Sequence, residues 1–262
     1  MVKVGILYIC TGKYSMFWDG FYEHAEKNFL PEAEKHYFIW TDDRNILKLS
    51  KKNPYIHTYQ QKPEPWPYPT LKRFEYFLRA ETDLEKMDYC MYMNSNLIVN
   101  EVIHEDEILP KGEEKLFFTL HPGYFEKPLE DYPYDRNPLC SAYVKETEGQ
   151  YYFAGGFNGG VTSEYLNMMK CLSERIQKDL EKGIIPVWHD ESQINKYAIE
   201  YDKPYRILNP CYLNPENKDW NILFEKKIIV LDKEKYGGHD FLRDNRTFIM
   251  KVIKYIRNIL GK

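Results

Sequence analysis

The sequence predicts an α/β protein with a mostly parallel central sheet and helices on both of its faces. Short apolar runs, typical of buried strands, alternate with stretches of helical periodicity through the N-terminal half. This β-α-β order favours parallel strands joined by helical crossovers. In addition, a chain of 262 residues can bury one substantial core, so a single large domain is expected over residues 1–245.

Six segments of the first half carry a structural signal. The strands are short apolar runs, the helices repeat apolar side chains every three or four residues, and prolines mark the loop. The third strand is apolar on both faces, as expected for a central strand covered by helices. In chain order, we expect a strand at 4–9, a helix at 16–30, a strand at 35–43, a loop at 51–70, a helix at 71–87 and a strand at 90–100.

Polar residues and a glycine accompany these three strands. Gly12 and Asp42 lie at the ends of the first and second strands, and Asn96 lies within the third. Ligands of parallel α/β sheets bind beyond the carboxyl ends of the strands. We therefore expect Gly12, Asp42 and Asn96 to meet at one ligand-binding edge.

The second half of the chain is rich in loops, with a helix expected near residues 163–181. An apolar stretch at 183–187 predicts a strand, which leads through Trp-His-Asp-Glu at 188–191 into a further helix. Two interpretations of Asp190 and Glu191 are open from position alone. Acidic residues are favoured at a helix start by the macrodipole. Four adjacent large or ionisable residues at a strand-to-helix junction also suit a site of catalysis.

Composition narrows the functional classes. A net charge of −4 gives no support to bulk nucleic-acid binding. The five cysteines are scattered and form no C-x-x-C pair, which indicates reduced thiols of a cytoplasmic protein rather than a disulfide framework or a zinc site. No apolar run reaches the length that spans a membrane. The 23 tyrosines suit a surface that holds sugars, although tyrosine also packs at domain surfaces.

Residues 94–96, Asn-Ser-Asn, place two amides one residue apart in an apolar strand. Two carboxylates at this spacing would hold a divalent cation for a phosphate group. Amides instead offer neutral carbonyl oxygens and N–H donors, which weaken a cation site but can donate directly to phosphate or ribose oxygens. The other interpretation of the three residues is a simple turn.

Three motifs carry a resemblance to a known family: TLHPGYF, YYFAGGFNGG and VWHDESQINKY. The glycine-rich motif lacks the spacing of a phosphate-binding loop; glycines flanked by aromatics more often let a backbone approach a ligand or another element. In this order and at these separations, the three motifs resemble glycosyltransferase family 6, and the resemblance covers residues 5–243. That family includes the histo-blood-group A and B transferases, the α-1,3-galactosyltransferase and bacterial members.

The resemblance implies a GT-A fold and transfer of Gal or GalNAc from a UDP-sugar to the 3-hydroxyl of a galactose, with retention of the α configuration. The family acceptor is Fucα1-2Gal. Vertebrate members carry Asp-x-Asp and need Mn²⁺, whereas bacterial members resemble this chain in carrying Asn-x-Asn and lacking a membrane anchor. We therefore expect a cytoplasmic enzyme without a divalent-metal cofactor, in which cationic side chains stabilise the leaving UDP.

The resemblance also implies which residues bind the nucleotide. Tyr14 matches the aromatic residue that borders the uracil pocket, whereas the family's phenylalanine is missing at Ile9. Lys233 matches a basic residue of the C-terminal tail that folds over the diphosphate, with Lys235 and Arg243 as rivals. The expected UDP-binding residues are Ile9, Thr11, Tyr14, Asn94, Asn96 and Lys233.

For the donor sugar, Gly156 and Gly123 match two positions at which the family chooses between GalNAc and Gal. A glycine at position 156 leaves room beside C2 of the sugar, where an added methyl group would clash with an acetamido group. UDP-GalNAc is therefore the expected donor, and Ala154, in place of a larger family residue, leaves UDP-Gal open. Arg73 matches a family arginine that reaches the donor, but a surface helix arginine is the alternative. The expected donor-sugar residues are Arg73, Ala154, Gly155, Gly156 and Asp190.

Glu191 matches the family carboxylate on the β-face of the anomeric carbon and is the expected catalytic residue. Retention requires either double displacement through Glu191 or front-face attack assisted by the leaving phosphate, and both stay open. For the acceptor, Trp188 offers an apolar face to galactose and His121 a hydrogen bond to its hydroxyl. The expected acceptor-binding residues are His121, Trp188 and Glu191, although residues 212–220 diverge from the vertebrate motif.

Two other functional classes stay open. A lectin-like, non-catalytic glycan-binding protein would keep the aromatic and glycine-rich motifs but would not need Arg73, Glu191 and Lys233 together. A glycosidase would pair Asp190 with Glu191, yet adjacent carboxylates usually point apart and rarely reach the necessary separation.

Residues 246–262 predict a C-terminal helix with one apolar stripe and a basic opposite side. One interpretation is packing on the protein's own core or on a second subunit. The other is a basic amphipathic helix on an anionic inner membrane, near lipid-linked or surface glycan acceptors. Self-association and peripheral membrane contact are thus alternative expectations for this segment.

Overall fold

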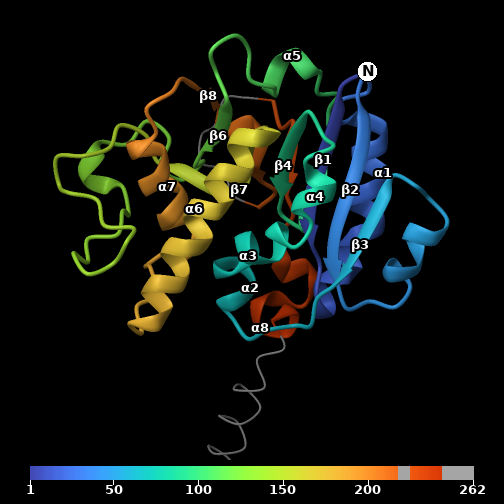
Figure 1. Ribbon diagram of the computed structural model, residues 1–262, viewed down its shortest axis with the longest axis horizontal. Helices are drawn as coiled ribbons and strands as arrows, with labels where there is room; N and C mark the ends of the chain where they lie inside the picture. The colour runs from blue at the N-terminus through green and yellow to red at the C-terminus, as the bar shows by residue number, and fades with distance from the viewer. Residues whose placement is uncertain (218–224, 244–262) are drawn as a thin grey trace, which may run out of the picture.

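A seven-stranded sheet forms the centre of the molecule, which Figure 1 shows as a computed structural model that describes residues 1–217 and 225–243. The strands are β1 (Lys3–Ile9), β2 (Glu34–Thr41), β3 (Ile56–Gln60), β4 (Tyr89–Met93), β6 (Leu116–Leu120), β7 (Phe153–Val161) and β8 (Tyr205–Leu208). Their order is β3-β2-β1-β4-β7-β6-β8, and β7 alone among them runs antiparallel to its neighbours. The predicted α/β class with a mostly parallel sheet is confirmed, and the arrangement is consistent with a GT-A fold.

Helices cover both faces of this sheet. The α-helices are α1 (Trp18–Asn28), α2 (Tyr68–Leu71), α3 (Arg73–Leu78), α4 (Glu81–Leu84), α5 (Glu105–Ile108), α6 (Thr162–Glu181), α7 (Asp190–Glu200) and α8 (Gly238–Leu242). The 3-10 helices are η1 (Gly12–Phe17), η2 (Ile46–Lys51), η3 (Leu129–Asp131), η4 (Pro210–Leu213) and η5 (Lys233–Tyr236). The helices expected near 16–30 and 163–181 are confirmed as α1 and α6.

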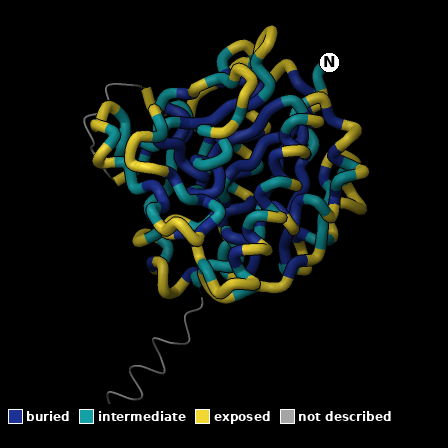
Figure 2. The backbone as a smooth tube through the Cα atoms, turned by 60° about the vertical axis from the view of Figure 1, so that its left-hand side comes forward, coloured by how far each residue is buried: buried dark blue, intermediate teal, exposed yellow. Residues whose placement is uncertain are grey.

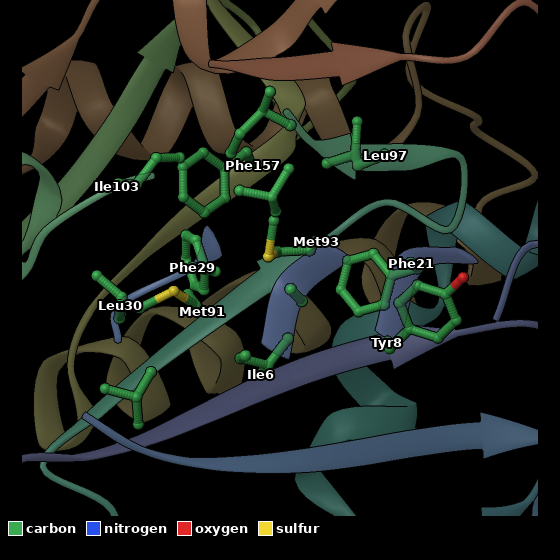
Figure 3. Packing of buried hydrophobic residues seen from close by; sticks show 14 of the residues in the cluster. Ile6, Tyr8, Phe21, Phe29, Leu30, Met91, Met93, Leu97, Ile103 and Phe157 are labelled. Carbon is green, nitrogen blue, oxygen red and sulfur yellow. The ribbon is translucent and has the colours of Figure 1, made fainter. Parts of the chain in front are cut away.

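Two large buried apolar clusters lie on opposite faces of the sheet, because successive side chains of a strand point in opposite directions. Ile6 and Tyr8 of β1 pack with Phe21 of α1 in one cluster, part of which Figure 3 shows from close by. Leu7, between them in the chain, packs with Leu172 of α6 in the other. Figure 2 shows the buried residues concentrated in the central strands, with exposed residues along the loops.

The expected strand at 90–100 is divided, which corrects the prediction. β4 ends at Met93, and the chain turns at 94–96 before β5 (Leu97–Val99). β5 belongs to a separate three-stranded sheet with β10 (Ile228–Val230) and β9 (Asn214–Pro215), in the order β5-β10-β9. The Asn94 N–H donates to Gly156 O at 3.0 Å and continues the β4–β7 pairing, whereas the Leu97 N–H turns back to Asn94 O at 3.2 Å. The strand is divided because the residues beyond this turn pair with β10 instead. The turn interpretation of Asn-Ser-Asn is thus correct for the backbone.

Two predictions about residues 51–87 are wrong. The expected loop at 51–70 contains β3, because its apolar, β-branched and aromatic residues pair in parallel with β2 before the prolines begin. The expected helix at 71–87 is three short helices, α2, α3 and α4. The backbone ψ angles at Lys72 and Ala80 are 7° and 11°, outside regular α-helical geometry, and they separate the three helices.

The expected strand at 183–187 is also wrong, since this part of the chain is irregular and α7 begins directly after it. The Val187 N–H donates to Asp135 Oδ2 at 2.9 Å instead of joining a ladder. By contrast, the glycine-rich motif forms β7. A methyl group at Gly159 would lie 2.5 Å from Met91 Cβ, and one at Gly160 would lie 2.3 Å from Lys115 O. Glycine therefore lets β7 lie close to its neighbours on both sides, which confirms the close-approach interpretation of these two glycines.

The helix predicted for residues 246–262 lies outside the described residues. Among the residues that are described, no helix is long and apolar enough to cross a membrane.

Candidate functional site

A cavity of about 260 Å³ opens at the edge of the sheet where β1 and β4 end. Four separate parts of the chain line it, at residues 9–14, 63–70, 92–95 and 233–243. Five of the six expected UDP-binding residues are among the lining residues: Ile9, Thr11, Tyr14, Asn94 and Lys233. Arg243, an alternative to Lys233 as the expected diphosphate-binding residue, also lines the cavity. Lys235, the other alternative, forms an ion pair with Glu216 and is not among the lining residues.

The turn after β1 brings the strand ends together as expected. Gly12 has a φ of 57°, which favours glycine, and its N–H donates to Asp42 Oδ1 at 2.6 Å. The Tyr8 hydroxyl donates to Ser95 O at 2.8 Å, which ties the third strand end to the first. The Asn96 side chain points elsewhere: its Nδ2 donates to Leu231 O at 2.9 Å, so it contacts the chain ahead of Lys233 and does not line the cavity.

Two cationic side chains and two aromatic rings form one wall of the cavity. Lys233 Nζ lies 5.4 Å from the ring centre of Tyr14, and the Arg243 guanidinium lies 3.6 Å from the ring centre of Trp66. Burial, together with the neighbouring charge of Arg243, lowers the pKa of Lys233 to about 8. Burial next to a like charge is costly for a lysine, and an anion bound between the two cations would relieve that cost.

The residues at positions 94 and 96 do not fit a hard divalent cation. Asn94 Oδ1 accepts a hydrogen bond from the Tyr92 hydroxyl at 2.8 Å, and Asn96 uses its Nδ2 on the Leu231 carbonyl. Asn96 Oδ1 is buried and has no hydrogen-bond partner in the described chain. Mg²⁺ and Ca²⁺ prefer carboxylate oxygens, and two neutral amides that face different partners form no such cage.

Arg73 and Asp190 form a buried ion pair beside the cavity. Arg73 Nη1 lies 2.8 Å from Asp190 Oδ2, and the two side chains are only 2% and 8% exposed. The surface-arginine alternative is therefore wrong. Arg73 also lies 4.1 Å from the ring centre of Tyr92, a cavity residue, and its Nε and Nη2 have no partner among the described residues. Burial raises the pKa of Asp190, and Arg73 opposes that rise.

Glu191 lies next to this pair, with both carboxylate oxygens engaged. Gly155 N–H donates to Oε2 at 2.8 Å, and the Tyr152 hydroxyl donates to Oε1 at 2.9 Å. Burial raises the pKa of Glu191, while these two hydrogen bonds oppose the rise. Asp190 and Glu191 both stand in the first turn of α7, so the helix-start interpretation is correct for the backbone, and their chemical role stays a prediction.

Gly155 and Gly156 are neighbours in β7 but face different side chains. A methyl group on Gly155 would lie 3.1 Å from Asp190 Oδ2 and 3.4 Å from Glu191 Cβ. A methyl group on Gly156 would instead lie 3.3 Å from Leu213 Cδ2 and 3.8 Å from Asn94 Cβ. Gly155 therefore faces the carboxylates, whereas Gly156 and the largely buried Ala154 belong to the side of the sheet that carries Leu213.

The expected acceptor residues lie beyond Glu191. Trp188 is 47% exposed, so a large part of its ring surface is open to solvent. Its backbone N–H donates to Ser192 Oγ at 3.0 Å. His121 packs against Tyr152, with ring centres 5.8 Å apart, and its Nδ1 accepts the N–H of Gly123 at 3.0 Å. Tyr152 therefore links the two residues: its ring packs on His121, and its hydroxyl donates to Glu191.

Several residues of the site were not predicted from the sequence, among them Lys13, Trp66, Tyr92, Tyr152 and His189. His189 has a φ of 55°, rare for a residue with a side chain, and its ring meets Trp66 edge-on at 5.1 Å. His189 directly precedes the two carboxylates in the chain, and this position could have identified it as a site residue. Trp66 carries no such signal, since it lies in a proline-rich stretch far from the other motifs in the chain.

Comparison with known proteins gives a consistent result. The sequence profile of glycosyltransferase family 6 matches residues 1–239. The chain is 33% identical over 238 residues to the O-antigen biosynthesis glycosyltransferase WbnI of Escherichia coli, a match that covers 90% of this chain and 98% of that protein. It is 30% identical over 215 residues to the histo-blood group ABO system transferase 1 of Rattus norvegicus, covering 80% of this chain and 60% of the relative.

A third relative is the globoside alpha-1,3-N-acetylgalactosaminyltransferase 1 of Gallus gallus, 26% identical over 222 residues, which are 83% of this chain and 63% of that protein. The chain thus spans about three fifths of the length of these two vertebrate relatives and nearly the whole of the bacterial one.

Proposed function

Because this chain belongs to glycosyltransferase family 6, we propose that it transfers GalNAc from UDP-GalNAc to the galactose 3-hydroxyl of a Fucα1-2Gal acceptor, with retention and without a divalent metal. The observation that carries the proposal is the arrangement of Arg73, Asp190 and Glu191 around Gly155, beside a cavity with two cationic side chains. An ion pair and a positioned carboxylate beside a cavity that cationic side chains line suit transfer from a nucleotide-sugar.

The cavity suits the UDP part of the donor. Its lining combines apolar and aromatic side chains, such as Ile9 and Tyr14, with hydrogen-bonding groups at Thr11 and Asn94. Lys233 and Arg243 would face the diphosphate. As the bond between C1 and the phosphate oxygen breaks, negative charge grows on UDP, and nearby cations stabilise that charge. In this proposal they replace the divalent ion that the amides at 94 and 96 are poorly suited to hold.

The donor sugar would lie between the cavity and Glu191. Arg73 keeps two guanidinium nitrogens unpaired among the described residues, which leaves donors for a sugar hydroxyl or a phosphate oxygen. The acceptor O3 forms the new bond to C1, the C1–O bond to UDP breaks, and the proton of the acceptor hydroxyl leaves with the phosphate. Glu191 either forms a glycosyl intermediate first or stabilises positive charge on the sugar during front-face attack.

Two observations favour UDP-GalNAc over UDP-Gal. Glycine at 156 adds no side chain next to Asn94, a cavity residue, where a methyl group would lie 3.8 Å from Asn94 Cβ. The globoside transferase among the relatives is named for N-acetylgalactosamine transfer. Galactosyl transfer from UDP-Gal is the alternative, since Ala154 is also small and a smaller sugar fits the same space.

For the acceptor, exposed Trp188 offers an aromatic face to galactose and His121 a ring nitrogen to its hydroxyl. The ABO-type relative favours an acceptor of the histo-blood group kind. A non-catalytic glycan-binding protein is the second alternative, and the buried Arg73–Asp190 pair against Glu191 disfavours it, because sugar binding alone gives no reason to bury three ionisable groups together.

The test is incubation of the full-length chain with 2′-fucosyllactose and either UDP-GalNAc or UDP-Gal, with and without EDTA, followed by mass spectrometry of the products. We expect a product heavier by one HexNAc, formed equally in EDTA, and a lower rate with UDP-Gal. A Glu191→Gln variant should bind UDP with unchanged affinity and lose most transfer. Turnover that EDTA abolishes and Mn²⁺ restores contradicts the metal-free proposal, and binding of the glycan without any transfer supports the glycan-binding alternative.

A further inference from the structure

Tyr152, directly before β7, contacts the carboxylate expected to be catalytic. Its hydroxyl donates to Glu191 Oε1 at 2.9 Å, while the Gly155 N–H donates to Oε2 at 2.8 Å. Each carboxylate oxygen therefore accepts one hydrogen bond. Two such bonds fix the plane of the group more firmly than either bond alone, because rotation about the terminal bond of the side chain would break both.

The Tyr152 ring is itself held in place. It is 2% exposed, and the hydroxyl of neighbouring Tyr134 donates to Tyr151 O at 2.6 Å, which fixes the chain just before it. Four aromatic rings lie with centres 5.1 to 6.0 Å from that of Tyr152, a distance range typical of favourable ring pairs. They belong to His121, Tyr124, Tyr132 and Tyr134. One of the four, His121, is an expected acceptor residue.

We propose that Tyr152 is a positioning residue that holds the Glu191 carboxylate in its reactive orientation and connects it to the acceptor side through His121. This role rests on the transferase function proposed above. In its absence, Glu191 would keep only the bond from Gly155, and its carboxylate would rotate more freely between the donor and acceptor sides.

The charges around Glu191 give the proposal a pH-dependent readout. Arg73 faces Glu191 from α3, Asp190 precedes it in α7, and Tyr152 reaches it from the segment before β7. Burial raises the pKa of Glu191, whereas the bonds from Gly155 and Tyr152 and the charge of Arg73 lower it. Burial and the nearby carboxylate raise the pKa of Tyr152 well above its ordinary value, so its hydroxyl keeps its proton and donates. Removing that hydroxyl should raise the pKa of Glu191 and move the acidic limb of the kcat profile to higher pH.

The test compares Tyr152→Phe with Tyr132→Phe, a matched control that removes a hydroxyl from the same aromatic cluster but keeps the ring that packs on Tyr152. With whichever UDP-sugar the wild-type protein uses, we expect Tyr152→Phe to lower kcat about ten- to hundredfold, the effect of a hydrogen bond to a charged group. The KM for the UDP-sugar should stay unchanged, and the acidic limb should shift. Tyr132→Phe should keep both kcat and the profile.

A double-mutant cycle separates this role from a general loss of structure. In a Glu191→Ala background, Tyr152→Phe should cause no further loss of the residual activity, because the group on which Tyr152 acts is gone. A further loss of similar size in that background, or an unchanged kcat and pH profile in the single variant, overturns the proposal. A wild-type protein that transfers neither sugar contradicts the transferase function itself, which is a different and earlier failure.

Discussion

Each buried charged side chain of the site depends on a few direct partners, in an ion pair or through hydrogen bonds. Arg73 and Asp190 lie in a region where an unpaired charge would be far from water. Glu191 beside them is held by hydrogen bonds rather than by a cation. Replacing one of these side chains should therefore lower the stability of the protein when it leaves a buried partner without its ion pair or hydrogen bond.

Arg73→Met should destabilise the fold by about 3 kcal/mol or more, because it leaves the Asp190 carboxylate buried without its partner. Urea unfolding at neutral pH measures this loss. The double variant Arg73→Met with Asp190→Asn removes both charges and should recover part of the stability, while transfer activity stays lost. Equal stability of Arg73→Met and wild type would show that the ion pair is not what keeps Asp190 charged in this environment.

Gly156→Ala should lower the preference for UDP-GalNAc over UDP-Gal by about tenfold, as expected for a clash of about 1–2 kcal/mol with the acetamido group. The added methyl group meets the end of a leucine side chain, which can move, so folding should be little affected. The kcat/KM values for the two donors check this prediction.

Gly155→Ala is the control for that experiment. Its methyl group would lie 3.1 Å from Asp190 Oδ2, so it should lower transfer from both donors alike. A donor ratio that is unchanged in Gly156→Ala contradicts the steric explanation.

Among the elements, α7 and β7 are joined by one buried side chain. Asn195 of α7 is 1% exposed; its Oδ1 accepts the Phe153 N–H at 2.8 Å, and its Nδ2 donates to Phe153 O at 2.8 Å and to Glu191 O at 2.9 Å. This triple contact holds the first turn of α7 against the start of β7, which is where Glu191 meets Gly155 and Tyr152.

Asn195→Ala should therefore lower stability by about 2–3 kcal/mol, since it leaves buried backbone groups of Phe153 unpaired. It should also lower kcat, while UDP affinity is kept, because other segments build the cavity. Thermal unfolding and UDP titration check the two parts. Asn167→Ala, on the exposed side of α6, is the control and should change neither. A parallel loss of UDP affinity would mean that α7 and the cavity form one cooperative unit.

The elements also show why sequence patterns succeed in some places and fail in others. β1, β2, α1, α6 and α7 have apolar periodicities that their local sequence sets, and all were predicted. The break at Asn94 was not, because it arises where β5 leaves the central sheet to pair with β10, far later in the chain. Asn96 was expected to face the nucleotide, but the side chain bonds to Leu231, a partner that no local pattern indicates.

At the scale of the whole molecule, the candidate site combines segments from both halves of the chain. The family motifs located Asp190, Glu191 and the glycines, because these residues are contiguous in sequence. Trp66 and Tyr152 were missed, since their roles depend on His189, Arg243 and Glu191, which reach them only through the fold.

The C-terminal segment 246–262, outside the described residues, still carries the prediction made from its sequence. Deleting it should leave transfer to soluble acceptors intact and abolish sedimentation with anionic vesicles, because a basic amphipathic helix binds such surfaces. Vesicle sedimentation and the soluble assay measure the two effects. Aggregation or unfolding of the truncated chain would instead favour packing of this segment on the protein's own core or on a second subunit.

Donor binding should also be coupled to proton uptake. With a pKa of about 8, Lys233 is largely neutral in the free protein at pH 9. A diphosphate beside it favours the ammonium form, so each binding event should take up to one proton from the buffer, and the affinity for UDP should fall as the pH rises above 8. Calorimetric titration at pH 9 should give binding enthalpies that vary with the ionisation enthalpy of the buffer, and Lys233→Met should remove that variation.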